Sequence, residues 1–598
     1  MKEAFKKLFE LLPAPDKLKF AALFVLMIIG TFLEVIGIGM VPIFVGAVAN
    51  PDMLLGHDIA GPILEWAGIT TSRELLTTGG ILLVLIFFIK GVYLVWLNYV
   101  QSRFISNRYA AISEKLFNAY LHAPITFHLG RNTAELIRNI NIETRYISNQ
   151  IMRPFLIILM AATTITGIFL LLIIVEPIIT LVALVLIGGV GGLILKILKK
   201  SISLYGQIAG KERERMIKVI NEGLGGIKDV IVMNRQPYFA RKFKHYVNNM
   251  VDAEIFKGVT TFSSRPVIEF VAVAGMMAIA FILVWQGRGL EAIIPVLTLF
   301  GVATVRLLPN VALIVNQLNN LRYYIHALRP VHADIKLLQH HADIAASERE
   351  TGKLEFKKLI NLENLWFRYP NSDEYVIKGI NLQIERGSAV GFVGASGAGK
   401  STIVDIILGF YEPEKGRIMV DNQNISANKR KWQNSVGYIP QFIFLSDDTI
   451  RNNIAFGLTE DQISEEWLQE SVQAAQLESL IEELPEGLDT VIGERGTRLS
   501  GGQRQRIGIA RALYSNPSVL VMDEATSALD NITEQHINEA IDKLKGERTI
   551  IMIAHRLTTV KNCDQLYVME NGRITENGNY DELMNNSYVF REMALESN

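Results

Sequence analysis

The chain has 598 residues, 49% of them hydrophobic, and a formal net charge of −1 at pH 7. This length exceeds one domain, and the hydrophobic content points away from an ordinary soluble protein. A near-neutral chain lacks the strongly basic face that a nucleic-acid partner requires, and its one cysteine, Cys563, excludes an internal disulfide framework and a cysteine-cluster metal site.

Residues 1–19 predict an amphipathic helix at a membrane surface. Five lysines are interspersed with apolar residues, among them Phe5, Leu8, Phe9 and Leu12. This pattern is typical of a helix that lies in the interface of a bilayer. A solvated helix start is the alternative.

Six apolar runs follow, and each is long enough to supply the roughly 20 residues that a helix needs to cross the hydrocarbon core. The runs span residues 20–45, 79–100, 154–175, 177–198, 259–285 and 292–315. Their length and number argue against buried helices of a soluble protein. We therefore predict an all-α membrane domain of six transmembrane helices, with long cytoplasmic extensions, over residues 1–330.

The distribution of lysine and arginine predicts the orientation of these helices. The short loops at 48–78, 176 and 286–291 hold only Arg73 and Arg288, whereas residues 101–153 and 196–257 are rich in both types. Positively charged loops stay on the cytoplasmic side. We expect a multi-pass protein of the cell inner (plasma) membrane, with both termini in the cytoplasm.

Each long cytoplasmic segment contains a helix break. The first break is at Ala123 and Pro124, and the second is the run GLGG at 223–226. Short elements at these breaks are candidates to contact a cytoplasmic domain, and simple loops are the alternative.

Five ionisable residues lie within or beside the apolar runs: Glu34, Lys90, Arg265, Glu269 and Arg306. A charge near the bilayer centre costs on the order of 2.5–3.5 kcal/mol, so it normally faces a cavity or a partner. Their sum is +1, which favours a cavity for an anionic group. Pairing of Arg265 with Glu269, and of Glu34 with Lys90, is the structural alternative.

The pattern changes after residue 353. Residues 331–353 are mixed charged and polar, which predicts a linker, and short strands, turns and helices over 354–598 predict a cytosolic α/β domain.

The most informative stretch of the α/β domain is GASGAGKST at 394–402. It follows an apolar strand, AVGFV, and precedes an apolar helix, which is the context of a P-loop. Glycines let the backbone wrap around phosphate oxygens, the lysine reaches the β/γ-phosphates, and the serine of KST ligates Mg²⁺. The predicted ATP-binding residues of this loop are Gly394, Ala395, Ser396, Gly397, Ala398, Gly399, Lys400, Ser401 and Thr402.

Further signals complete a nucleotide site. Tyr369, about 25 residues before the loop, is a candidate to stack on adenine. LSGGQ opens a helix and predicts a second phosphate-binding element, formed by Ser500, Gly501, Gly502 and Gln503.

The strand VLVMDE ends in two carboxylates. Asp523 suits the Mg²⁺ shell, and Glu524 suits the base that polarises the attacking water. Gln441 follows another strand-like run, and His555 ends a third, from which it can contact the γ-phosphate.

These motifs, in this order and spacing, resemble those of the ATP-binding cassette (ABC) transporters. The resemblance implies two such domains in a head-to-tail sandwich, with ATP between Lys400 of one chain and Ser500 of the other. It also implies that Gln441 senses the γ-phosphate and Mg²⁺, that His555 is the switch histidine, and that Ser527 to Asp530 cross the dimer. The segment from Gly493 to Gly496 is similar to the one that meets the membrane domain in exporters.

One membrane domain followed by one ATPase domain resembles a half-transporter of the type IV exporter class, which implies a homodimer; a heterodimer is the alternative. Four membrane segments resemble the lipid-linked oligosaccharide flippases: FLEVIGIGMVPIFV with Glu34, FFIKGVY with Lys90, RPVIEF with Arg265 and ATVRLLPN with Arg306. The resemblance implies a substrate cavity that contains these residues and binds a polyprenyl pyrophosphate.

We predict an ATP-hydrolysing flippase or exporter that works by alternating access and moves a lipid-linked oligosaccharide from the inner to the outer leaflet. The alternatives are a general lipid or multidrug exporter and a peptide exporter. ATP and Mg²⁺ are the expected cofactors, with Gln441, Glu524 and His555 as catalytic residues and Ser401, Gln441 and Asp523 as metal ligands. The expected partners are a second copy of the chain and a membrane lipid, and no nucleic acid.

Overall fold

The computed structural model consists of two compact units. Unit 1 comprises residues 1–123 and 128–345, and unit 2 comprises residues 124–127 and 346–598. The structure describes residues 2–49, 51, 55, 60–175, 177–285, 290–347, 352–370, 372–493, 496–524, 535, 539, 541–554, 556–557 and 559–596.

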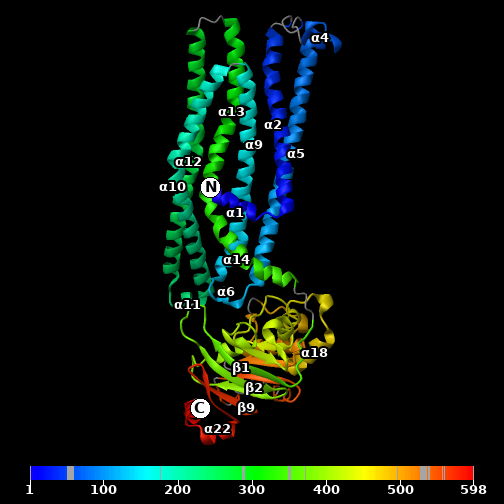
Figure 1. The fold of residues 1–598 in the computed structure, drawn as a ribbon, viewed down its shortest axis with the longest axis vertical. Coiled ribbons are helices and arrows are strands. Elements are labelled where there is room, and N and C mark those ends of the chain that lie inside the picture. Colours follow the sequence, from blue (N-terminus) through cyan, green and yellow to red (C-terminus); the bar gives the residue numbers. More distant parts are fainter. Residues whose placement is uncertain are drawn as a thin grey trace. The chain divides into compact units, whose positions relative to one another are not determined.

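Unit 1 is all-helical, and each of the six predicted apolar runs lies in a long helix (Figure 1). These helices are α2 (Ala14–Ala49), α5 (Ser72–Leu121), α9 (Arg153–Val175), α10 (Pro177–Gly225), α12 (Gln236–Trp285) and α13 (Leu290–Tyr324). Helix α10 packs along α12, α2 along α5, and α9 along α13. Among the described residues, three helical segments are long and apolar enough to cross a membrane: Ala14–Val48, Ser72–Leu121 and Thr133–Ile174.

Local sequence signals explain several helix boundaries in unit 1. Thr71 caps α5 through a capping box with Glu74, which satisfies two backbone N–H groups. Pro177 opens α10, where its missing N–H costs nothing. The predicted breaks follow α5 and α10: α6 (Ile125–Leu129) comes after the first, and α11 (Ile227–Val232) after the second.

The remaining helices of unit 1 are shorter. They are α1 (Lys2–Glu10), α4 (Ala60–Trp66), α7 (Thr133–Arg138), α8 (Thr144–Tyr146) and α14 (Leu328–Ser347), with π-helical turns η1 (Asn139–Glu143) and η2 (Ile147–Met152) and a 3₁₀ turn η3 (Ile325–Ala327). In the predicted amphipathic segment, Leu8 and Leu12 are buried.

The interval 331–353, predicted as a linker, begins inside a packed helix. Helix α14 buries Val331, Ile335 and Leu338, which recur at helical spacing on one face. Asp334 is 1% exposed and accepts hydrogen bonds from Tyr120 Oη (2.6 Å), Asn139 Nδ2 (3.2 Å) and a nitrogen of the Arg131 guanidinium (3.1 Å). Because the interval contains many charged residues, the sequence did not predict this apolar face or the buried hydrogen bonds of Asp334.

Unit 2 contains two sheets. An antiparallel sheet has the order β2-β1-β4-β5, from β1 (Leu359–Phe367), β2 (Ile377–Glu385), β4 (Lys415–Val420) and β5 (Gln423–Asn424). A second sheet has the order β10-β9-β3-β8-β7-β6, from β3 (Ala389–Val393), β6 (Val436–Ile439), β7 (Val519–Asp523), β8 (Thr549–Ile553), β9 (Gln565–Glu570) and β10 (Arg573–Gly578). All neighbours in the second sheet are parallel except β9 and β10.

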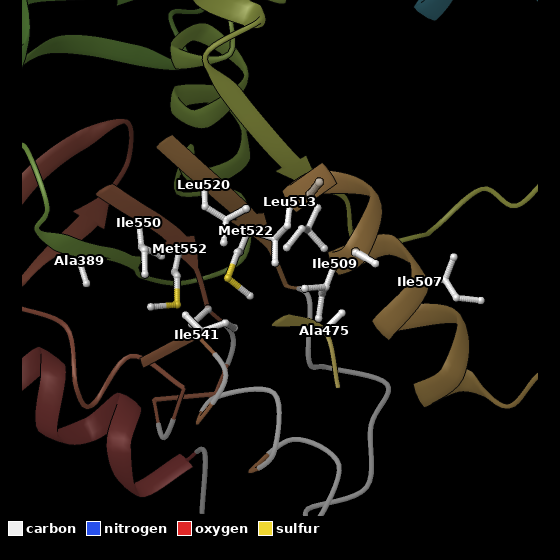
Figure 2. Close-up of a cluster of buried hydrophobic side chains, with 14 of the residues drawn as sticks. Ala389, Ala475, Ile507, Ile509, Leu513, Leu520, Met522, Ile541, Ile550 and Met552 are labelled. Carbon is white, nitrogen blue, oxygen red and sulfur yellow. The ribbon is translucent and has the colours of Figure 1, made fainter. Parts of the chain in front are cut away.

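The inner strands of the second sheet, β3, β7, β8 and β9, are buried on both faces. Leu520 and Met522 of β7 belong to one apolar cluster, which also contains Ile509 of helix α20 (Gly501–Tyr514). Figure 2 shows these side chains together with their neighbours on β8. Val519 and Val521 point to the opposite cluster. Burial on both faces explains why these strands are uninterrupted apolar runs.

Helices complete unit 2. They are α15 (Lys400–Ile407), α16 (Lys429–Gln433), α17 (Ile450–Ile454), α18 (Glu465–Ala474), α19 (Glu478–Glu483), α22 (Tyr580–Asn586) and α23 (Tyr588–Glu596), with short 3₁₀ turns at Ile425–Ala427, Glu460–Gln462 and Gly487–Asp489.

A close contact joins α2 to α9 in unit 1. Thr31 Oγ1 donates a hydrogen bond to Thr163 Oγ1 (2.9 Å), and a Cβ at Gly167 would lie 2.7 Å from Val35 Cγ2. We predict that Gly167→Leu lowers the melting temperature of the full chain, because overpacking typically costs about 1–3 kcal/mol. Gly91→Leu is the matched control, since a Cβ there meets nothing within 4 Å. Equal melting temperatures for the two variants would contradict the contact.

Candidate functional site

The sheet of unit 2 gathers the predicted catalytic motifs at one edge. Strands β6, β7, β8 and β3 are parallel neighbours, so their carboxyl ends lie on the same side. The P-loop follows β3, Gln441 lies two residues beyond β6, and Asp523 ends β7. Ligand sites in open α/β sheets form at this edge.

The P-loop is held in a shape that only glycine permits at two positions, Gly394 and Gly399. Gly394 has φ +148°, and a Cβ there would lie 2.3 Å from the carbonyl oxygen of Met569. Gly399 has φ +103° and directly precedes α15, with a Cβ position 3.1 Å from Ile377 Cδ1. The loop therefore leads directly into the N-terminus of a helix, where backbone N–H groups favour an anion.

Lys400 lies inside this loop. It is 5% exposed, and its Nζ donates to the carbonyl oxygens of Gly394 (2.7 Å) and Ala395 (3.1 Å). Burial lowers the pKa of Lys400, and the charges of Glu524 and Asp523 oppose that shift. The lysine is thus held next to the loop and within electrostatic reach of both carboxylates.

Glu524 is hydrogen-bonded to the predicted sensor glutamine. Gln441 Nε2 donates to Glu524 Oε2 at 2.5 Å, and the backbone N–H of Glu524 donates to the carbonyl of Ile553 (3.1 Å). Glu524 has φ +48°, in the left-handed region that non-glycine residues rarely adopt. Such backbone strain is concentrated at functional sites, where it fixes the direction of a side chain.

The oxygen groups at this edge suit a hard cation. Ser401, Gln441 and Asp523 offer a hydroxyl, an amide carbonyl and a carboxylate, and Mg²⁺ prefers oxygen ligands of these kinds. The side chain of Ser401 is exposed. These residues therefore fit Mg²⁺ in chemical type.

Asp405, on α15, is a carboxylate at this edge that the sequence analysis missed. Burial and the charge of Asp523 raise its pKa from an ordinary value of 3.8 to about 6. Asp405 is four residues after Ser401, so both lie on one face of α15. That i, i+4 spacing was the available signal.

Tyr369 is fixed beside the end of the P-loop. Its hydroxyl and that of Thr402 are 3.0 Å apart, and its ring makes edge contacts with Phe367 (5.2 Å) and Tyr411 (5.6 Å between centroids). Tyr411 was also missed, because one aromatic residue after a helix carries no pattern. The half-buried Tyr369 ring remains partly accessible for stacking.

Ser500 caps helix α20. Its Oγ accepts from the backbone N–H of Gln503 (3.2 Å), and its own N–H donates to Gln503 Oε1 (2.7 Å). A hydroxyl that accepts one bond can still donate another. Gln503 therefore acts as part of the cap here, while Gly501 is exposed at the first turn.

Several predicted residues lie outside the part that the structure describes. These are His555, the segment from Ser527 to Asp530, and two residues of the segment from Gly493 to Gly496. The side chain of Arg306, a predicted cavity residue, is also outside it.

In unit 1, the other predicted cavity residues form ion pairs. Lys90 Nζ lies 2.5 Å from Glu34 Oε2, and Lys90 is 6% exposed. Arg265 Nε lies 2.7 Å from Glu269 Oε1, and both side chains are largely exposed. Of the two interpretations of these charges, the geometry favours structural pairing for Lys90 and Arg265.

A cavity of about 500 Å³ does lie within unit 1, between α2, α5, α9 and α13. Its polar lining consists of Glu34, Asn98, Gln101, Thr164 and Asn310, and the rest is apolar. Gln101 Nε2 is buried and has no hydrogen-bond partner. Lys90 and Arg265 are not among the lining residues.

Sequence comparison decides the family. The model of the ABC transporter ATPase matches residues 377–527, and that of the ABC transporter transmembrane region matches residues 20–302. An ATP-dependent lipid A-core flippase from Cupriavidus pinatubonensis (strain JMP 134 / LMG 1197) is 30% identical over 505 residues, 83% of each chain. The chain belongs to the ABC transporter family.

Two further relatives of this ABC transporter extend the comparison. The heterocyst differentiation ATP-binding protein HepA from Nostoc sp. (strain PCC 7120 / SAG 25.82 / UTEX 2576) is 38% identical over 61% of the chain and 58% of that protein. The solved structure of a bacterial Atm1-family ABC exporter with ATP bound matches 97% of the chain and 98% of that structure, with a TM-score of 0.71 and 23% identity. The fold is that of a type IV exporter, and the ABC transporter is a membrane protein that binds ATP and couples its hydrolysis to transport.

We predict that Glu524→Gln lowers ATP hydrolysis at least about 100-fold, the usual contribution of a general base, and leaves ATP binding intact. Phosphate release and binding of a fluorescent ATP analogue measure the two effects. Lys400→Ala is the control that loses ATP affinity as well. Normal turnover in Glu524→Gln would remove Glu524 from the catalytic role.

A second prediction concerns Asp405. Its pKa is raised to about 6 in the folded protein, so the ionised carboxylate lowers the free energy of unfolding. This loss of stability is complete above pH 6 and declines as the pH falls from 6 towards 3.8. We expect Asp405→Asn to raise the melting temperature at pH 7.5 and to raise it less at pH 5. A gain that is the same at both pH values would contradict this electrostatic origin.

Proposed function

We propose that this ABC transporter is a lipid flippase that moves a lipid-linked oligosaccharide from the inner to the outer leaflet of the cell inner membrane. The observation that carries the proposal is the cavity between α2, α5, α9 and α13. Its three amide groups and the Thr164 hydroxyl suit the hydroxyl groups of a glycan, and its apolar walls suit a lipid. The buried, unpartnered Gln101 Nε2 would gain a hydrogen bond from such a ligand.

The pyrophosphate of this substrate class needs a cation. Lys90 and Arg265 are already paired, so Arg306 is the residue of the predicted set that we propose for this contact. Glu34 lines the cavity and forms an ion pair with Lys90, which does not itself line the cavity.

A general lipid exporter is the second candidate. The relatives that support it are called ATP-dependent lipid A-core flippases, at 30% identity in Cupriavidus pinatubonensis and 28% in Escherichia coli (strain K12). Lipid A-like lipids share phosphate groups and sugar hydroxyls with a lipid-linked oligosaccharide. The same cavity would therefore serve either substrate.

We propose a homodimer with the termini and unit 2 in the cytoplasm. The chain has one P-loop, and the site that we propose needs a second phosphate-binding element, Ser500 of the partner subunit. Helix α11 supports a partner, because Ile227, Ile231 and Val232 on this six-residue helix are 42%, 55% and 80% exposed. Apolar side chains gathered on one surface element of this kind commonly mark an interface.

In this mechanism, Lys400 binds the β/γ-phosphates, and Ser401, Gln441 and Asp523 are the proposed metal ligands. Bound Mg²⁺ would neutralise developing charge on the phosphoryl oxygens. Glu524 accepts the proton of the attacking water once Gln441 releases it, and His555 is proposed to contact the γ-phosphate. Because ATP binds the closed dimer better than the open one, binding and hydrolysis shift unit 1 between its inward and outward states.

The test is ATPase activity of the reconstituted full chain with a polyprenyl-pyrophosphate oligosaccharide. We expect stimulation of the wild type and of Arg265→Ala, whose exposed ion pair is the matched control, and loss of stimulation in Arg306→Ala. Equal stimulation of all three by lipid A-like lipids, with no response to the oligosaccharide lipid, would replace the proposal by the general lipid exporter.

A further inference from the structure

A second pocket, of about 340 Å³, lies elsewhere in unit 1. Its walls come from three segments: residues 138–146, residues 206–214 of α10, and residues 323–330 at the junction of α13 and α14. None of the cavity residues of the proposed transport path lines it. It is therefore a separate feature of the molecule.

The limits of the predicted apolar runs place this pocket beyond the lipid headgroups. Tyr146, Gly206 and Tyr323 are each eight positions outside the predicted apolar runs, which end at Pro154, Leu198 and Val315. Eight helical residues span about 12 Å. The headgroup region on each side of a bilayer is only about 5–8 Å thick. A ligand of this pocket would thus arrive from water.

The lining carries surplus positive charge. Arg138 forms ion pairs with two acids of the same pocket, Glu214 (2.9 Å) and Glu143 (3.6 Å). Across the described residues, Lys211, Arg213 and Arg329 form no ion pair. The four cationic side chains of the pocket outnumber its two carboxylates, and the resulting charge of +2 favours an anion. Guanidinium groups bind phosphate and carboxylate well.

Tyrosines form the rest of the wall. The Arg213 guanidinium lies 4.9 Å from the ring centroid of Tyr146, and the Tyr146 and Tyr324 rings are 4.8 Å apart. Tyr323 is 3% exposed, and its hydroxyl has no hydrogen-bond partner. A buried hydroxyl left unsatisfied costs about 1–3 kcal/mol, which a ligand oxygen would offset.

The backbone is shaped to hold these groups together. A Cβ at Gly206 would lie 2.2 Å from the carbonyl oxygen of Tyr323, so only glycine lets α10 and α13 approach this closely. Tyr146 lies between two π-helical turns, Asn139–Glu143 and Ile147–Met152. Such turns are rare and occur frequently at functional sites.

We propose that this pocket binds a small water-soluble anion that carries an aromatic ring. The chemical class that we propose is an aryl phosphate. The phosphate contacts Arg213, Lys211 and the Tyr323 hydroxyl, and the ring packs against Tyr146 and Tyr324. Since the three walls belong to separate segments of unit 1, the bound anion stabilises their arrangement.

The test uses the full chain in nanodiscs of neutral lipid with saturating ADP, and phenyl phosphate as the probe. Ligand-observed NMR and a thermal shift measure binding. We expect saturable binding, weakened at least tenfold by Arg213→Gln and also weakened by Tyr323→Phe. Arg235→Gln is the matched control, because Arg235 is exposed and lies outside the pocket, and it should bind like the wild type.

Four results would overturn the proposal. Unchanged binding in Arg213→Gln and Tyr323→Phe would place the probe elsewhere, and loss of all binding on adding ADP would place it in the ATP site. If inorganic phosphate bound with equal affinity, the ring of the ligand would make no contribution, and the proposed contacts with Tyr146 and Tyr324 would be wrong. Displacement by phosphatidic acid in the nanodisc would show that a lipid headgroup reaches the pocket.

Discussion

The parallel strands of unit 2 impose the constraint on which the nucleotide site depends. Each strand is buried on both faces, so its residues alternate between two apolar clusters and cannot shift by a single position without exposing a core side chain. The loops at the carboxyl ends inherit this fixed register. The packing of the strands in the two apolar clusters therefore fixes Gly394, Gln441 and Asp523 at one edge of the sheet.

The membrane unit follows a different principle, in which opposite charges compensate each other within or between helices. Lys90 with Glu34 joins α5 to α2, and Arg265 with Glu269 is a pair along α12. Paired charges are tolerated at apolar depth where single ones are not. The polar lining of the cavity between α2, α5, α9 and α13 consists of Glu34, three amides and one hydroxyl, so hydrogen bonds dominate the polar contacts that it offers.

Sequence reasoning predicted the helices of unit 1 and the P-loop well, because both have strong local patterns: long apolar runs, and a glycine loop between a strand and a helix. It could not predict that Ser500 and Gln503 close a capping box, since the same letters also describe a phosphate site. It missed Asp405, whose role depends on burial and on the distant Asp523. It assigned residues 331–347 of α14 to a linker because charged and polar residues alternate there with the buried apolar ones.

The hydrogen bond between Gln441 and Glu524 links the predicted sensor of the γ-phosphate to the predicted base. The carboxylate that serves as the proposed base is engaged by an amide N–H donor and is held in a strained backbone conformation. In the proposed reaction, a shift of the Gln441 side chain would change the donors that reach the Glu524 carboxylate, and this would couple the predicted sensor to the predicted base.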